Sequence, residues 1–512
     1  MGKKWAPAAV LVLLALLAVF CTAGAEEAGE ARLVPLISIT TADPAEGTRF
    51  ATAPVKGNVA RSIASWTPGY VMPPEPYYVD CSVTCSLPDG RTAPHQAPAR
   101  VKVRGNWTTS YEKKPLRIHF EQKQPLCGLN GGRAFKDWVL LAEYKDLSML
   151  RNKAALDLAR KIMAEDGLYC SDCALVEVEI NGEYWGVYLL AEQQECAPGR
   201  VSVPEPKKNE LGPRTGYFLE FDGYYRLEDP MVAFAIDYAD FAPLTPFAGG
   251  AATRPFRPLS TAPDGRDNVG YTIHSSVRSV AQRNAVRDFL AGTYRIMYAA
   301  ACQDTALEMP DGWGTPVPSA RNPREAVEAV VDVNSLADMY LLSELVCDPD
   351  VYWSSFFMSV DLSPGGAGKL RFEAPWDFDS ALGNRYVCVD ATGFHAANVV
   401  DDVDHKYRAI NPWLAVLMEA DWFRNLIAEK WTALYDSGAL TDTVAMIRAD
   451  SRTYEPAFTR NYTRWSNMAD KSPLDYELNR EAFACRSEAE SAEQLAHWLE
   501  RRIAFLNGVW HR

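Results

Sequence analysis

Carboxylates that could act on a phosphoryl group lie in two short motifs in the second half of the chain. The first motif is Asp348-Pro349-Asp350, and the second is Pro375-Trp376-Asp377-Phe378-Asp379. One aspartate can orient or deprotonate an attacking hydroxyl, while another holds a magnesium ion against phosphate oxygens. This chemistry requires that the fold fixes the two motifs a few ångströms apart.

The residues between the motifs predict a hairpin that can hold them together. Strand patterns at 356–361 and 369–373 flank a Pro- and Gly-rich turn, and Ser355 stands five residues after Asp350. Helix, aspartate, polar residue, hairpin and then Asp-Phe-x is the order found in protein kinases. Kinases generally carry Asn where Ser355 stands, and a hydroxyl is a weaker metal ligand, so Asp379 could take over that task. A plain structural interpretation stays open, because Asp-Pro-Asp is a common turn and Trp-Asp-Phe-Asp can simply cap a strand.

The elements that must position these motifs differ between the two halves of the chain. The first 220 residues predict a mostly antiparallel sheet with one packed helix, and Asn181-Gly182 is a strong hairpin signal. The strands are expected at 33–40, 99–103, 116–120, 138–141, 175–180, 183–190 and 215–222, and the helix at 147–165. Helical patterns follow at 276–302, 324–347, 413–440 and 491–506.

These patterns predict an α+β protein with a sheet-rich N-terminal lobe, residues 26–229, and a mainly helical C-terminal lobe, residues 268–512. The C-terminal lobe carries the Asp350 and Asp377 motifs. Residues 230–267 are rich in Pro, Gly and Ala, and we expect a linker or flexible insert there.

The first 25 residues have the pattern of a cleaved signal peptide. Lys3 and Lys4 precede an apolar run at 8–20, which ends before Ala23-Gly24-Ala25. We therefore expect a secreted or cell-surface protein without a transmembrane segment after cleavage. The net charge of −14 argues against a nucleic-acid partner. Some disulfides are plausible, and Cys170-Ser-Asp-Cys173 favours a disulfide or buried thiols over a metal site.

Several ordered motifs resemble those of the spore-coat protein H (CotH) kinase family, a family of atypical secreted protein kinases. The resemblance covers roughly residues 35–440. Its motifs are Arg104-Gly105-Asn106, Lys113-Lys114-Pro115-Leu116-Arg117-Ile118, Trp138-Val139-Leu140-Leu141-Ala142, Leu150-Arg151-Asn152-Lys153, Asn181-Gly182-Glu183-Tyr184-Trp185-Gly186-Val187-Tyr188, Leu189-Leu190-Ala191-Glu192, Tyr340-Leu341-Leu342-Ser343-Glu344 and Asn411-Pro412-Trp413, together with the two aspartate motifs and Phe423.

The resemblance implies a divergent protein-kinase-like, two-lobed fold that binds ATP and Mg²⁺. The implied reaction transfers the γ-phosphate to Ser or Thr of secreted or spore-coat proteins. It implies that Asp350 orients the substrate hydroxyl and that Asp377 is the principal magnesium ligand. Asp379 would be a second ligand, and Ser355 stands at a further metal-ligand position.

The same resemblance assigns the nucleotide contacts. Arg104, Gly105 and Asn106 would form the turn that approaches the phosphates, and Lys114 would contact them, although Lys113 and Lys114 could instead be an exposed pair at a strand edge. Three assignments keep a structural alternative. Arg151 and Asn152 either touch the nucleotide or cap and brace their helix, and Glu192 either lies near the base pocket or forms a salt bridge.

Two other functions stay open. The chain could be a pseudokinase that acts as an extracellular binding or scaffold protein, or its fold could catalyse another nucleotide transfer such as adenylylation.

Overall fold

The computed structural model describes residues 32–238, 240–242, 244, 269–397, 400–401 and 408–512. The predicted signal peptide and most of the predicted linker at 230–267 lie outside these residues. Among the described helices, none combines the length and the apolar character needed to cross a membrane.

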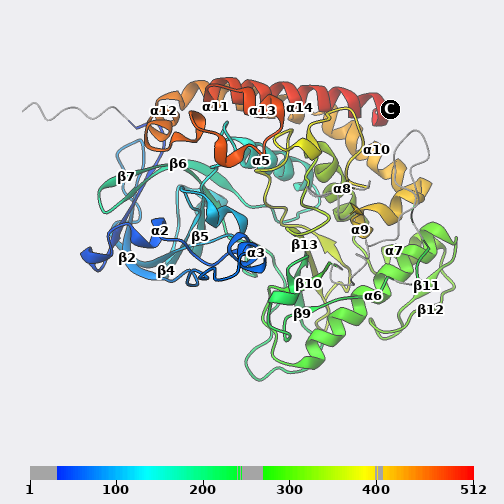
Figure 1. Ribbon diagram of the computed structural model, residues 1–512. Helices are drawn as coiled ribbons and strands as arrows, with labels where there is room; N and C mark the ends of the chain where they lie inside the picture. Colours follow the sequence, from blue (N-terminus) through cyan, green and yellow to red (C-terminus); the bar gives the residue numbers. More distant parts are fainter. Residues whose placement is uncertain (1–31, 239, 243, 245–268, 398–399, 402–407) are drawn as a thin grey trace, which may run out of the picture.

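Seven strands form a closed barrel at the N-terminal side of the molecule (Figure 1). The strands are β1 (Leu36–Thr41), β2 (Val79–Ser86), β3 (Ala97–Val103), β4 (Leu116–Gln124), β5 (Phe135–Leu141), β6 (Cys173–Ile180) and β7 (Glu183–Glu192). Their order is β1-β2-β3-β4-β5-β7-β6, and the parallel pairing of β1 with β6 closes the ring. The predicted antiparallel strands are confirmed, whereas the closure and β2 were not predicted.

The barrel strands β5, β6 and β7 are buried on both faces over most of their length, and they are mostly apolar. Along β2, β3 and β4, buried residues alternate with more exposed ones. Ile37, Val101 and Ile118 belong to a core inside the barrel. Val139 and Leu189 point outward and pack in the main core with the helix α5 (Arg151–Met163). The predicted helix at 147–165 is thus confirmed, and it joins the barrel to the rest of the protein.

A second sheet has the order β14-β13-β8-β10-β9. Its strands are β8 (Gly216–Asp222), β9 (Ala233–Phe234), β10 (Gly270–Ile273), β13 (Phe356–Asp361) and β14 (Arg371–Phe372). The predicted hairpin between the aspartate motifs is present as β13 and β14. The predicted strand at 215–222 is also present, but it pairs with β13 and not with the barrel. This second sheet therefore combines strands from both halves of the sequence.

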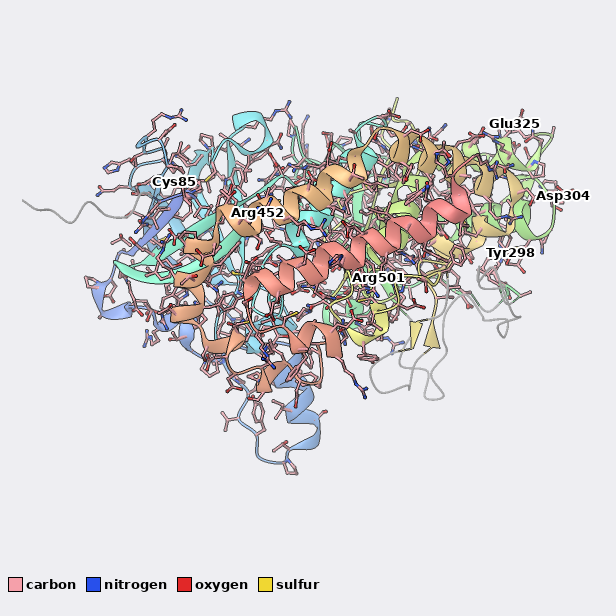
Figure 2. The ribbon with its side chains drawn as sticks, turned by 90° about the horizontal axis from the view of Figure 1, so that it is seen from above. Cys85, Tyr298, Asp304, Glu325, Arg452 and Arg501 are labelled. Carbon is pink, nitrogen blue, oxygen red and sulfur yellow. The ribbon has the colours of Figure 1, made fainter. Side chains whose placement is uncertain are left out.

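The C-terminal half is largely helical, as predicted. Its longer helices are α6 (Val280–Cys302), α8 (Val333–Val346), α10 (Asp421–Asp436), α11 (Ala439–Thr453), α12 (Glu455–Arg464) and α14 (Glu488–Trp510). The helices α11 and α14 lie side by side along one face of the molecule (Figures 1 and 2). The predicted helix at 324–347 is divided, because Val331 pairs with Leu370 between α7 (Pro323–Glu328) and α8.

The remaining helices and strands are short. They are α2 (Arg49–Thr52), α3 (Asn58–Trp66), α4 (Leu129–Gly132), α9 (Pro412–Val416), α13 (Arg480–Ala484), β11 (Leu307–Glu308), β12 (Val317–Pro318), β15 (Val400–Asp401) and β16 (Arg408–Ala409).

Every cysteine in the described part of the chain is a free thiol. Cys173 is buried and Cys170 is partly buried, so the CxxC motif holds thiols and not a disulfide. Burial raises the pKa of both thiols. Cys85 and Cys127 are close to each other, with their Sγ atoms 3.5 Å apart.

Candidate functional site

A cavity of about 1120 Å³ brings residues from the barrel and the second sheet together. The turn after β3, the end of β5, and strands β8 and β10 contribute to its walls. Asp350, Asp377 and Asp379 all line it, as does Ser355. The structure therefore gathers the two aspartate motifs in one space.

The three carboxylates influence one another electrostatically. Burial, with the negative charges of Asp379 and Asp350, raises the pKa of Asp377 to about 7. Asp377 also has a left-handed backbone, with φ of 72°. Burial raises the pKa of Asp379, and the nearby Lys145 ammonium opposes this shift. A site with this concentration of negative charge favours a cation.

Lys145 is a site residue that the sequence motifs did not identify. Its Nζ lies 2.9 Å from Asp379 Oδ1 and donates a hydrogen bond to Ser380 Oγ at 2.7 Å. The side chain is buried and lines the cavity. Burial lowers the pKa of Lys145, but Asp379 and Glu477 outweigh that effect and raise it overall. The available signal was a pair of charged residues, Glu143 and Lys145, just after the apolar strand β5.

Lys114 lies outside the set of residues that line the cavity. It is 6% exposed, and its Nζ donates to the carbonyl oxygens of Thr109 and Tyr111 at 2.9 and 2.6 Å. Lys113 is also buried, and its Nζ donates to Asn461 Oδ1 at 2.9 Å. The two lysines are therefore not an exposed pair, and in this structure Lys114 braces the turn that follows β3.

That turn itself lies at the cavity. Arg104, Gly105 and Asn106 all line it. The approach of this turn to phosphates, which the family resemblance implies, stays a prediction. Gly105 has φ of 100°, and a Cβ atom there would lie 2.5 Å from Thr108 Oγ1. Only glycine fits this conformation without strain. Burial lowers the pKa of Arg104, and the carboxylate of Asp377 opposes that shift.

The two predicted residues at the start of α5 have different positions. Asn152 lines the cavity, and its Oδ1 accepts a hydrogen bond from the backbone N–H of Phe378 at 2.7 Å. Its Nδ2 donates to Glu143 at 3.0 Å. Arg151 is buried outside the cavity wall, where it pairs with Asp146. Asn152 therefore fixes the second aspartate motif against the barrel, while Arg151 braces the helix.

Glu192 forms a salt bridge, which was one of the two predictions made for it. Its Oε1 lies 3.1 Å from Arg200 Nε and accepts a hydrogen bond from Asn130 Nδ2 at 2.6 Å. Glu192 is outside the cavity wall, whereas the next two residues, Gln193 and Gln194, line it. Gln194 is 8% exposed, and its Nε2 has no hydrogen-bond partner in the part of the chain that the structure describes.

Ser355 joins the aspartate cluster to the second sheet. It has φ of 61°, and its backbone N–H donates to Glu220 Oε1 at 2.7 Å. Glu220 lies on β8 and also contacts His274 Nε2 at 2.8 Å. Burial, with the charge of Glu220, raises the pKa of the neighbouring Asp222 to about 6. This wall of the cavity is acidic.

Within the described residues, no three His, Cys, Asp or Glu side chains are arranged to hold a metal ion. A magnesium ion is usually held by only one or two carboxylates together with substrate phosphates. The carboxylates of Asp377 and Asp379, which both line the cavity, have the donor chemistry of such a site.

Comparison with known proteins connects this geometry to a family. The model of the CotH kinase protein family matches residues 101–222 and 315–506. A search of curated proteins finds no match to the chain. The matched residues contain the turn after β3, Lys145 and both aspartate motifs, and they span most of the two sheets. The chain belongs to the CotH kinase protein family.

Proposed function

We propose that this protein is an atypical protein kinase that transfers the γ-phosphate of ATP to a Ser or Thr hydroxyl of a secreted or coat protein. The observation that carries the proposal is the convergence of Asp350, Asp377, Asp379 and Lys145 on one cavity, which the turn around Gly105 also lines. Membership of the CotH kinase family supports it.

The order of the elements supports a kinase-like, two-lobed architecture. A glycine turn follows β3, Lys145 follows β5, and α5 comes directly after it. The hairpin of β6 and β7 then leads through Gln193 and Gln194 to the second sheet, which carries the aspartate motifs. Protein kinases place a glycine-rich loop, a lysine strand, a helix and two aspartates in this order.

The charges of the cavity suit a magnesium nucleotide. Lys145 and Arg104 place positive charge where phosphates would lie, and backbone N–H groups of the Gly105 turn can approach the same oxygens. Asp377 and Asp379 would hold Mg²⁺, which neutralises charge on the phosphates. In this proposal Lys145, and not Lys114, is the phosphate-binding lysine.

The remaining aspartate handles the acceptor. Asp350 would accept a hydrogen bond from the substrate hydroxyl and orient its oxygen towards the γ-phosphorus. A bond forms between that oxygen and phosphorus, the bond from phosphorus to the ADP oxygen breaks, and the hydroxyl proton passes to Asp350. Positioning and electrostatics account for most of such catalysis.

The test compares wild-type protein with Asp350→Asn and Asp377→Asn, using ATP labelled at either the α- or the γ-phosphate and a Ser-rich acceptor. We expect γ-label transfer by the wild type and a loss of about 10²-fold or more in both variants. Asp361→Asn is the matched control, because Asp361 ends β13 outside the cavity wall.

Other outcomes separate the rival functions. Transfer of the α-label instead of the γ-label would identify adenylylation. Nucleotide binding without transfer would identify a pseudokinase, and absence of nucleotide binding would favour a scaffold.

A further inference from the structure

A segment near the end of the chain packs beside the part of the cavity that Lys145 and the turn around Gly105 line. We call this part the phosphate end, because the proposed function places the phosphates there. We call residues 465–485, between α12 and α14, the C-terminal strap. Asn467 Nδ2 donates to the carbonyl oxygen of Tyr144 in the barrel at 2.6 Å. The backbone N–H of Asn479 donates to the carbonyl oxygen of Asn384 at 2.8 Å. The strap therefore connects the end of β5 to the residues that follow the second aspartate motif.

Apolar packing holds the strap in place. Tyr111 and Tyr144 stack with ring centroids 5.1 Å apart. Leu474 and Leu478 of the strap are buried in the same small cluster. At the rim of the cavity, Trp107 of the glycine turn meets Tyr476 of the strap edge-on, with centroids 6.3 Å apart. The strap is thus packed against the turn that the proposed function places near the phosphates.

One strap residue, Glu477, contacts both the turn that follows β3 and Lys145. It is 3% exposed and lines the cavity. Its Oε1 accepts hydrogen bonds from Trp107 Nε1 at 2.9 Å and from the Tyr111 hydroxyl. Its Oε2 lies 4.0 Å from Lys145 Nζ. The two oxygens of one carboxylate therefore serve different partners.

We propose that Glu477 is a positioning residue that fixes the glycine turn and Lys145 relative to each other at the phosphate end of the cavity. This inference rests on the proposed function. Through Oε1, Glu477 fixes the approach of the turn from the barrel side. Through Oε2, it shares the charge of Lys145 with Asp379, so that the ammonium stays buried and oriented.

The two tasks can be separated by substitution. Glu477→Gln keeps a carbonyl oxygen that accepts from Trp107 and Tyr111, but it removes the negative charge beside Lys145. We expect this variant to bind Mg-ADP about threefold or more tightly, because an anion then meets a less neutralised lysine. Its turn keeps its hydrogen bonds, so the turnover number changes less than the affinity.

Glu477→Ala removes both tasks. We expect the turn to loosen, the KM for ATP to rise and kcat to fall about tenfold, since a small displacement of positioning groups lowers rate strongly. Tyr111→Phe removes one donor to Oε1 and leaves the charge, so it should lower kcat without tightening Mg-ADP binding. Glu477→Gln and Tyr111→Phe carry the test if Glu477→Ala fails to fold.

Glu481→Gln is the matched control, because Glu481 lies on the same strap but is exposed and points to Arg501 at 3.5 Å. Mg-ADP binding is measured by calorimetry, and kcat and KM by γ-label transfer. Unchanged binding and kinetics in Glu477→Gln and Tyr111→Phe, with only a lower Tm, would overturn the inference and leave the kinase proposal intact. A wild-type protein that does not bind Mg-ADP would overturn both.

Discussion

Lys114 and Lys145 are both buried, but their ammonium groups have different partners. This difference decides which of the two is suited to bind a phosphate. Lys114 satisfies carbonyl oxygens of its own loop, whereas Lys145 faces the cavity beside Asp379. The two carbonyl oxygens hold the Lys114 ammonium within its own loop. In the proposed function Asp379 would also bind the metal, which would leave the Lys145 ammonium available to phosphate oxygens.

Substitution of each lysine by methionine tests this distinction. We expect Lys145→Met to lower γ-label transfer by about 10²-fold or more, because a cation is lost where charge develops. Lys114→Met should instead reduce the free energy of unfolding by about 1–3 kcal/mol, because it leaves two buried carbonyl oxygens unpaired. Transfer per folded molecule and chemical denaturation are the measurements. A larger loss of transfer in Lys114→Met than in Lys145→Met would contradict the assignment.

The sequence identified those site residues that stand in short motifs next to predicted helices and strands. Asp350, Asp377 and Asp379 follow predicted elements at short spacing, and they do line one cavity. Lys145 and Glu477 were missed, because their roles depend on contacts with residues far away in the chain. The roles given to the aspartates stay predictions until transfer is measured.

At the scale of elements, the contact between α11 and α14 contains a buried acid. Glu488, the first residue of α14, is 7% exposed, and its Oε2 accepts a hydrogen bond from Ser451 Oγ of α11 at 2.8 Å. The nearby charged groups that act on it, Asp146 and Glu455, are acidic. Burial raises the pKa of Glu488 to about 8.

This acid makes the stability of the protein depend on pH. The folded pKa is raised above the ordinary value of 4.5, so the folded state binds more protons between about pH 4.5 and 8. The stability from Glu488 is fully present below that window and is lost as the pH rises through it. We expect Glu488→Gln to flatten the fall of Tm across the window. Glu490→Gln, at an exposed position of the same turn, is the control, and an identical pH profile in both variants would contradict this account.

Local pattern predicted most elements but not their long-range pairing. The hairpins β6–β7 and β13–β14 were predicted, because each is closed by a short turn with a clear signal. The closure of the barrel was not predicted, because the parallel pairing of β1 with β6 joins residues some 140 positions apart. Assignment of β8 to the second sheet failed for the same reason, since its partner β13 comes much later.

At the scale of the whole molecule, the cavity draws its walls from the barrel, the second sheet and the C-terminal strap. A ligand that fills this cavity would contact all three parts at once. Anything that binds only the folded state stabilises it by mass action.

Nucleotide should therefore raise the Tm of the whole protein in one transition. At Mg-ADP concentrations of 100 times Kd we expect a gain of about 2.7 kcal/mol in the free energy of unfolding. Differential scanning calorimetry with and without Mg-ADP is the measurement, and Asp377→Asn should show a much smaller gain. A shift confined to one of two separate transitions would show that the ligand contacts one part only.

The ion pair of Lys145 and Asp379 links the proposed binding of metal to the proposed binding of nucleotide. A phosphate bound to Lys145 alone would leave the buried Asp379 without this partner, and a metal bound to Asp379 alone would leave the ammonium with only the more distant Glu477. A buried charge that loses its partner is costly. In the proposed function, metal and nucleotide would each remove the penalty that the other incurs, and their affinities would be reciprocally coupled. We therefore expect the free protein to bind the metal–nucleotide complex more tightly than either component alone.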